Sequence, residues 1–362
     1  MLTGDPGQLP PVIGLSMWVD RTSKGARISG LALKGYYLYR SIKNVMKLTV
    51  VLRQGGFFME ALLRLRDGKS TVEDHEFIMQ NCAEQNMTPE RINAFKGDDT
   101  MYLFTTNADN NTHNMNQIQK INEKICLIQA EHDCKSSKSR STEGARKLAN
   151  KLYVSKRSRV MLLWNVNISL GLVNGSTGHV VGFIYREGHK APDLPYSIII
   201  HFDDYKGPPF FTIYGCKQYE NISVDPLIKE WVLISPPDKR EKWVPILVSE
   251  YKWGKSVNDE NPNHSRKQFP ICLAWALTVW KSQGMTIKGL VKFLLGDKEK
   301  EHGLTYVGFS RVLKHEQLDI GPGCSLERLT TKISNGYRLK RRLIEDIRLD
   351  VLYDTCRIFF SN

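Results

Sequence analysis

The spacing of hydrophobic positions predicts α/β structure in the stretch that runs to residue 128. Residues 48–52 and 101–106 are short apolar runs rich in β-forming side chains, which is typical of strands. Each run is followed by apolar side chains at helical spacing: Phe58, Leu62 and Leu65 in one segment, and Ile118, Ile121, Ile125 and Ile128 in the other. A strand followed by an amphipathic helix is the repeating unit of α/β folds.

A different pattern occupies residues 159–251, where short β-rich runs are separated by turn signals. The runs cover residues 160–164, 179–185, 196–202, 231–234 and 243–248. Asn174-Gly175 and Pro236-Pro237 are two of the turn signals between them. This pattern predicts a small β-barrel or SH3-like insertion. From Phe269 the sequence predicts a helical region that leads into a strand near residues 290–295, so that α/β character returns.

Charge and composition indicate the kind of partner. The chain carries 51 Lys and Arg against 38 Asp and Glu, a formal net charge of +13. Such an excess suits a polyanion, because basic side chains release counterions from phosphates. No apolar run reaches the roughly 18 residues of a membrane span, and no secretory signal segment is visible. We therefore expect a protein that is neither secreted nor inserted in a membrane.

The cysteines indicate a reducing compartment. Seven of them are scattered at positions 82, 126, 134, 216, 272, 324 and 356, and no pair has C-x-x-C spacing. This distribution favours reduced thiols over a disulfide framework. Cys126, His132 and Cys134 lie close together in the sequence, and we interpret them as core or surface positions rather than as a zinc site.

Four short segments carry the candidate chemistry. The first is Gly4-Asp5-Pro6-Gly7-Gln8-Leu9-Pro10-Pro11, and the second is Arg53-Gln54 after the apolar run at residues 48–52. The third is Thr278-Val-Trp280-Lys281-Ser282-Gln283-Gly284, and the fourth is Thr305-Tyr-Val-Gly308-Phe-Ser310-Arg311. Their order resembles motifs III, IV, V and VI of the Pif/RecD-like superfamily 1B ATP-dependent DNA helicases. The resemblance covers essentially the whole chain, aligned to the second half of such an enzyme.

The resemblance implies an α/β fold. It comprises a RecA-like motor domain of the P-loop NTPase type with a small β-barrel or SH3-like insertion, preceded by the edge of a truncated first RecA-like domain. Residues 1–47 would be the remnant of that first domain. The second RecA-like domain would occupy residues 48–155 and return at 269–330, around an SH3-like insertion at 156–268. Residues 331–362 would form a basic amphipathic tail.

The resemblance also implies roles around the terminal phosphate of ATP. Gln8 would report the γ-phosphate to the DNA-binding face, and Arg53 and Arg311 would approach that phosphate as arginine fingers. Arginine suits this role because its planar fork stays charged and binds phosphate oxygens with two nitrogens. The predicted nucleotide contacts are Gly4, Asp5, Gln8, Arg53, Gln283, Gly284 and Arg311.

Motif V would couple the nucleotide state to the grip on DNA. Thr278, Lys281 and Ser282 are the predicted contacts to the DNA backbone, which would make binding independent of sequence. The family usually has His where this chain has Trp280, and the indole could stack on a base or pack in the core. Motif VI usually has Ala where this chain has Gly308.

The phosphate-gripping loop G-x-x-x-x-G-K-[ST] does not occur in the sequence. Gly68-Lys69-Ser70 and Gly254-Lys255-Ser256 lack the earlier glycine, and Asp203-Asp204 falls in the β-rich segment, so we interpret it as a pair of loop carboxylates. The family requires ATP and Mg²⁺, but the main motifs that bind them are missing here. Because residue 1 falls just before motif III, we expect a C-terminal portion of a helicase that is inactive alone.

The sequence therefore predicts an ATP-dependent DNA helicase, with 5′-to-3′ polarity taken from the family. Single-stranded DNA and duplex junctions are the expected partners, and the oligomeric state is left open. The alternative is a non-enzymatic remnant that binds single-stranded DNA, and an RNA-directed helicase fits the β-rich insertion less well. A nuclear or mitochondrial location would follow in a eukaryote, and a cytoplasmic one otherwise.

Overall fold

The computed structural model describes residues 5, 7–9, 15–20, 25–42, 50–190, 192–208, 242–254, 264–296, 299–301 and 303–330. The chain divides into two compact units. Unit 1 comprises Met1–Asn110 and Leu277–Asn362, and unit 2 comprises Asn111–Ala276. Gly4, the run at 231–234 and the predicted tail at 331–362 lie outside the described residues.

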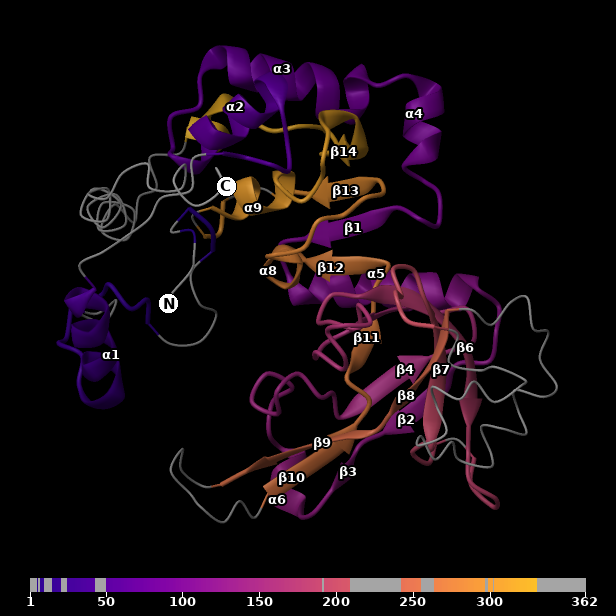
Figure 1. The fold of residues 1–362 in the computed structure, drawn as a ribbon. Coiled ribbons are helices and arrows are strands. Elements are labelled where there is room, and N and C mark those ends of the chain that lie inside the picture. The colour runs from indigo at the N-terminus through magenta and orange to yellow at the C-terminus, as the bar shows by residue number, and fades with distance from the viewer. Residues whose placement is uncertain are drawn as a thin grey trace, which may run out of the picture. The chain divides into compact units, whose positions relative to one another are not determined.

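Unit 1 is built on a four-stranded sheet with the order β12-β1-β13-β14 (Figure 1). The strands are β12 (Ala276–Thr278), β1 (Met101–Phe104), β13 (Val291–Leu294) and β14 (Leu318–Asp319). β13 pairs in parallel with both β1 and β14. Parallel strands need crossover connections, and helices provide them here. The sheet confirms the α/β class predicted for this part of the chain.

Helices α2 and α3 of unit 1 form where the local sequence predicts them. In α2 (Gly56–Arg66) the buried side chains include Phe58, Leu62 and Leu65, as their spacing predicts. Helix α3 (Val72–Cys82) begins with a capping box between Thr71 and Asp74. The other helical elements are α1 (Gly30–Ser41), η1 (Glu84–Asn86), α4 (Pro89–Ala94), α8 (Val279–Ser282), α9 (Leu304–Phe309), η4 (His315–Gln317) and α10 (Leu326–Thr330).

Unit 2 is dominated by an antiparallel sheet with the order β11-β5-β6-β7-β8. Its strands are β5 (Arg159–Leu162), β6 (Thr177–Ile184), β7 (Ser197–Phe202), β8 (Trp243–Leu247) and β11 (Ile271–Leu273). A second sheet, β3-β10-β9, contains β3 (Glu131–His132), β9 (Ser249–Trp253) and β10 (His264–Gln268). Strand β2 (Cys126–Gln129) pairs with β4 (Lys151–Val154), and the short α6 (Lys135–Lys138) lies between them in sequence.

The boundary of unit 2 differs from the predicted insertion at 156–268. Ile128 of β2 and Leu152 and Val154 of β4 belong to the same buried cluster as the five-stranded sheet. Burying these apolar side chains together joins β2 and β4 to unit 2, which therefore begins at Asn111.

Three predictions about elements were wrong. The helix predicted over Ile118–Ile128 ends with α5 (Asn107–Lys120), because Asn122 adopts φ 56° and Ile128 pairs in β2. The region after Phe269 forms the buried strands β11 and β12 before the short α8. In the run at 48–52, the described residues form no strand, and Leu52 is 92% exposed.

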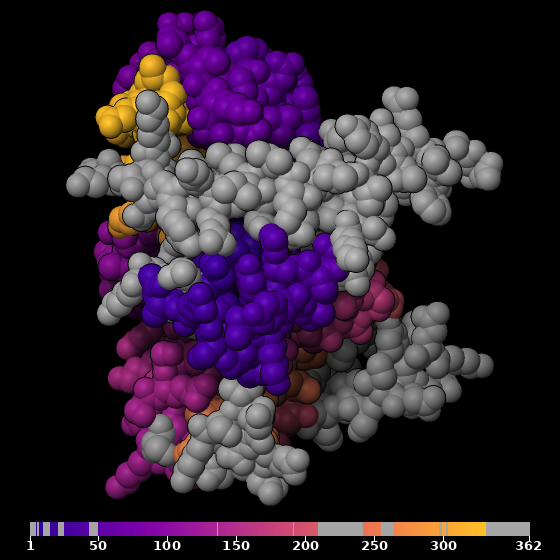
Figure 2. Space-filling model, turned by 90° about the vertical axis from the view of Figure 1, so that its left-hand side faces the viewer, coloured from indigo at the N-terminus to yellow at the C-terminus, as the bar shows by residue number. Residues whose placement is uncertain are grey.

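Helix α1 carries several large apolar side chains on its surface. Leu31, Tyr37 and Leu38 are each more than 60% exposed. Figure 2 shows the described N-terminal residues in indigo. Among the described residues, no helix is both long and apolar enough to cross a membrane.

Candidate functional site

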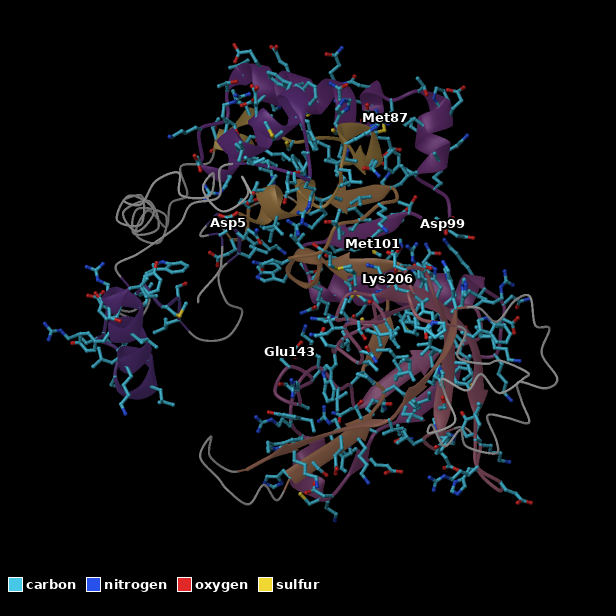
Figure 3. The ribbon with its side chains drawn as sticks, in the orientation of Figure 1. Asp5, Met87, Asp99, Met101, Glu143 and Lys206 are labelled. Carbon is cyan, nitrogen blue, oxygen red and sulfur yellow. The ribbon has the colours of Figure 1, made fainter. Side chains whose placement is uncertain are left out.

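The first motif segment is anchored to helix α2 through the carboxylate of Asp5. Asp5 Oδ1 accepts hydrogen bonds from the Gly7 amide at 2.7 Å and from Arg66 Nε at 2.9 Å. Arg66 Nη2 lies 2.8 Å from the same oxygen, so two guanidinium nitrogens meet it. Figure 3 shows Asp5 beside helix α9. Charge-assisted contacts of this kind are stronger than neutral ones, so they position the segment that carries Gln8.

Gln8 connects the first segment to the third. Its Nε2 donates to Asp5 Oδ2 at 3.4 Å, and its Oε1 accepts a hydrogen bond from Gln283 Nε2 at 3.3 Å. Gln283 and Gly284 are exposed, and Gly284 has φ 85°, a conformation that favours glycine. The structure therefore brings together three of the predicted nucleotide contacts, Asp5, Gln8 and Gln283.

A close backbone approach connects the first segment to the fourth. Gly303 precedes α9 with φ 82°, and a Cβ atom there would lie 2.7 Å from the Gly7 carbonyl oxygen. Any other residue would push the two segments apart. Gly303 is thus a positioning residue that the sequence motifs did not indicate.

The second segment holds the backbone of the fourth. Arg53 Nη1 donates to the Ser310 carbonyl at 3.0 Å. Gln54 Nε2 donates to the carbonyls of Ser310 at 3.1 Å and Val312 at 2.6 Å. Arg53 itself is half-buried. Arg53 and Arg311, which were both predicted to approach the γ-phosphate, thus lie in one unit, although their segments are far apart in the sequence.

Arg311 is almost completely enclosed, with 1% of its surface exposed. Its acceptors are the carbonyl oxygens of Val307 (2.7 Å), Ser282 (3.2 Å) and Met285 (3.0 Å) and the Ser310 hydroxyl (2.7 Å). Burial, followed by the charge of Arg53, lowers the pKa of Arg311 to about 10, so the guanidinium stays charged at neutral pH. In this structure Arg311 joins the backbones of the third and fourth segments.

The four predicted DNA contacts differ in their exposure. Thr278 is 5% exposed and precedes helix α8, and Ser282 is fully buried with its hydroxyl donating to the Val279 carbonyl at 2.8 Å. Trp280 and Lys281 are half-buried. Lys281 and Trp280 are therefore better placed for a phosphate or base contact than Ser282, whose hydroxyl stabilises the turn.

Comparisons with known proteins relate these motifs to a family. No protein-family model matches the sequence. The chain is 25% identical over 346 residues to the ATP-dependent DNA helicase PIF1 of Emericella nidulans, covering 88% of this chain and 41% of that protein. It is 25% identical over 312 residues to the human protein of the same name, covering 86% of this chain and 38% of that protein. The chain is thus similar to the Pif1 helicases over most of its own length, and it spans about two fifths of theirs.

Solved Pif1 structures share the fold. The Pif1 helicase of Candida albicans aligns with a TM-score of 0.57 at 19% identity, covering 92% of this chain and 67% of that one. The Bacteroides Pif1 helicase in complex with ADP-AlF3 and single-stranded DNA aligns with a TM-score of 0.57 at 16% identity, covering 95% and 67%. This likeness confirms the RecA-like fold predicted from the motifs.

Sequence reasoning missed two further residues of this Pif1-like site. Arg66 lies outside the four segments, and no local pattern distinguishes it from other helical arginines. Tyr306 lies inside the fourth segment but carries no obvious chemistry in the sequence. Burial, followed by the charge of Asp5, raises the pKa of the Tyr306 hydroxyl, while Arg66, Arg311 and Arg53 lower it. Tyr306 therefore lies among charged groups of the first, second and fourth segments and of helix α2.

Proposed function

We propose that the protein carrying this chain is an ATP-dependent DNA helicase that moves 5′-to-3′ on single-stranded DNA and unwinds duplex junctions. The homology to Pif1 helicases over most of the chain supports the proposal. The observation that carries it is the contact of Gln8 with Gln283, of Arg53 with Ser310 and of Arg311 with Ser282, which together link all four motif segments in unit 1.

The contacts divide the work between the two arginines. Arg53 is half-buried and would contact the γ-phosphate directly, because it has the more accessible guanidinium. Arg311 would transmit the nucleotide state, because it binds the carbonyls of Ser282 and Met285 next to the predicted DNA contacts. Stabilising the charge that develops on the transferred phosphoryl group is the main task of such arginines.

ATP and Mg²⁺ would be held mainly by residues other than those of the four motif segments. Unit 1 offers Gln8 and Arg53 toward a phosphate, and Asp5 is engaged by Arg66. The magnesium ion would neutralise phosphate charge when bound. The residues of this chain would sense the terminal phosphate and stabilise its developing charge.

The test is DNA-stimulated ATP hydrolysis by the protein that carries this sequence. Arg53→Ala is expected to lower kcat by about 100-fold or more while single-strand binding is retained, because an arginine finger acts in the transition state. Arg186→Ala, an exposed arginine of unit 2, is the matched control. Unchanged turnover in Arg53→Ala would contradict the assigned role.

A non-enzymatic protein that binds single-stranded DNA is the second candidate. The net charge of +13 favours it. Lys281→Gln should weaken single-strand binding and reduce the salt dependence by about one released counterion. DNA binding without any ATP turnover would support this candidate, and turnover that requires Arg53 would exclude it.

A further inference from the structure

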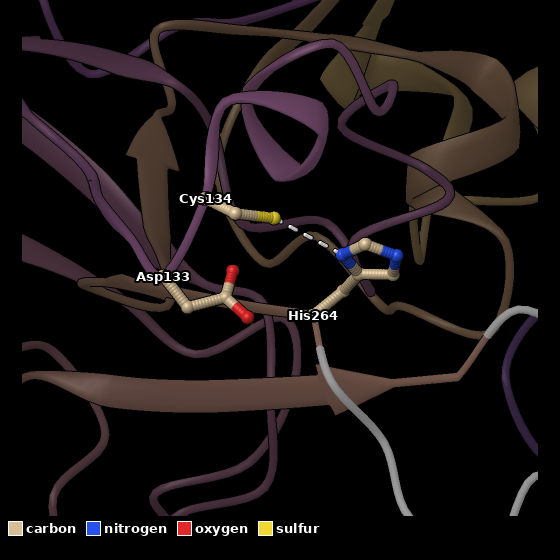
Figure 4. Close-up of side chains that lie close together, drawn as sticks. All are labelled: Asp133, Cys134 and His264. Carbon is tan, nitrogen blue, oxygen red and sulfur yellow. Dashed lines mark hydrogen bonds between the residues drawn. The ribbon is translucent and has the colours of Figure 1, made fainter.

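Unit 2 contains a cluster of metal-ligating side chains away from the motif segments. The ligand atoms of Asp133, Cys134 and His264 all lie within 4.8 Å of one another (Figure 4). Cys134 Sγ is 3.2 Å from His264 Nδ1. Asp133 is exposed, whereas the other two side chains are half-buried, so the cluster is open to solvent on one side.

Strand register brings these residues together across 130 positions of sequence. Strand β10 pairs antiparallel with β3, and Arg266 lies opposite His132. Continuing that register by two residues places Cys134 opposite His264 at the start of β10. The three side chains therefore meet because of backbone pairing, which sets their positions before any ion arrives.

The surroundings hold the three side chains in place. The fully buried Ser137 donates its hydroxyl to Asp133 Oδ1 at 2.5 Å and lies 3.2 Å from Cys134 Sγ. The Trp253 ring stacks near His264, with ring centroids 6.1 Å apart and planes at 30°. Outer contacts of this kind orient the ligands in metal sites.

A buried arginine fixes the loop that carries Ser137. Arg266 is 0% exposed, and it donates to the carbonyls of Leu148 at 2.8 Å, Ser137 at 3.1 Å and Arg140 at 2.7 Å. The loop after β3 is thereby tied to β10, which also carries His264. Both sides of the cluster thus belong to one rigid part of unit 2.

We infer that Asp133, Cys134 and His264 form a Zn²⁺ site that fastens the loop after β3 to the start of β10. A thiolate, an imidazole and a carboxylate are the donors that zinc prefers. Tetrahedral zinc with Zn–S near 2.3 Å and Zn–N near 2.05 Å places sulfur and nitrogen about 3.6 Å apart. The observed 3.2 Å needs only a few tenths of an ångström of opening.

Charge is compatible with this assignment. A thiolate and a carboxylate together carry two negative charges, which neutralise one Zn²⁺ ion. The fourth tetrahedral position is left for water. In the sequence, Cys134 was considered only together with Cys126 and His132, and the three were interpreted as core or surface positions. In the structure, the neighbour of Cys134 is His264 on β10.

Cobalt substitution tests the site. The purified chain is stripped with a chelator and titrated with Co²⁺, whose thiolate charge-transfer and tetrahedral d–d bands report sulfur ligation. We expect one equivalent of Co²⁺, displaced by Zn²⁺. Cys134→Ser should abolish the thiolate band, and His264→Gln should weaken Co²⁺ affinity by about tenfold or more. Ser137→Ala should weaken it by about tenfold through the lost outer contact.

Cys126→Ser is the matched control, because Cys126 is also half-buried in unit 2 and lies outside the cluster. It should retain the full band. Circular dichroism of the metal-free proteins shows whether each variant is folded. The inference is overturned if the wild-type chain gives no thiolate band, or if the band persists in Cys134→Ser. If Cys134→Ser does not fold, unchanged Co²⁺ affinity in His264→Gln overturns it instead.

Discussion

Among the described residues, each unit holds one arginine that is buried and bound to backbone carbonyls, yet the two differ in their neighbours. Arg311 of unit 1 is 1% exposed and Arg266 of unit 2 is 0% exposed. In both, burial followed by a second arginine lowers the pKa of the guanidinium; that arginine is Arg53 for Arg311 and Arg140 for Arg266. Burial and backbone contacts alone therefore do not distinguish Arg311, which stands in the fourth motif segment, from Arg266, which stands in none.

The difference lies in what surrounds each guanidinium. The charge of Arg311 lowers the pKa of Tyr306, and Asp5 of the first segment and Arg66 of helix α2 also act on that pKa. The described hydrogen bonds of the Arg266 guanidinium all go to carbonyl oxygens of residues 137–148, close to the Asp133–Cys134–His264 cluster. Arg311 thus lies where charged groups from several parts of unit 1 converge.

The largest effect is expected when either buried arginine becomes Met. Each variant leaves three carbonyl oxygens without their donor, at about 1 kcal/mol or more for each, so roughly 3 kcal/mol in total. Hydrogen exchange should show the loss at residues 131–148 for Arg266→Met and at residues 282–312 for Arg311→Met. Local exchange is the suitable measurement, because a chain with two units need not unfold in one step.

Arg186→Met is the control, since this exposed arginine contacts only the Tyr196 ring face, at 5.3 Å from its centroid, among the contacts described. It should cost under about 1 kcal/mol. Exchange that spreads through both units in Arg311→Met would break the comparison, because the two arginines would then not act locally.

Gly308→Ala is expected to have the next largest effect. A Cβ atom at Gly308 would lie 2.1 Å from Phe293 Cε1, and the Phe293 ring is fully buried. Overpacking of this kind costs about 1–3 kcal/mol, and the better helix propensity of Ala returns at most about 1 kcal/mol. The glycine that replaces the family's usual Ala in motif VI is therefore matched to Phe293. Thermal unfolding measures the loss.

Adding Phe293→Leu to Gly308→Ala should recover part of the lost stability, because the smaller side chain leaves room for the new methyl group. Gly35→Ala in α1 is the matched control, since nothing lies within 4 Å of a Cβ there. It should be neutral or stabilising. Equal destabilisation by Gly35→Ala would show that the Phe293 contact is not the cause.

The sequence predicted the parts of the fold that local pattern determines. Helical spacing located α2 through Phe58, Leu62 and Leu65, and β-rich runs between turn signals located β5, β6, β7 and β8. The run after Phe269 was misassigned, because a continuous apolar run in a buried strand has no period that distinguishes it from a buried helix.

The site was predictable only where motifs carry it. Gln8, Arg53 and Gln283 stand in motifs, and the structure places them in one unit. The contact of Arg66 with Asp5 depends on tertiary packing, and the contact of Cys134 with His264 depends on strand register. Neither leaves a local signal in the sequence.

The smallest expected effect is a loss of stability at low pH, which should begin at a different pH in each unit. In unit 1, burial raises the pKa of Asp74, but the Arg64 hydrogen bonds and the Thr71 amide outweigh it and lower that pKa below 3.8. In unit 2, burial, followed by the charge of Lys120, lowers the pKa of His113 below 6.5. Both folded groups resist protonation, so each unit loses stability as pH falls, starting near 6.5 in unit 2 and near 3.8 in unit 1.

Hydrogen exchange corrected for its intrinsic pH dependence, compared between about pH 7.5 and about pH 5.5, should show loosening at α5 and none at α3. His113→Gln should remove the loosening, because glutamine does not titrate. His189→Gln is the control, since the His189 side chain is 58% exposed and pairs only with Asp193 among its described ion pairs. Equal loosening of α3 in this range would show that a group other than Asp74 sets the acid response of unit 1. The two units would then lose stability over the same pH range, contrary to what the pKa shifts of Asp74 and His113 require.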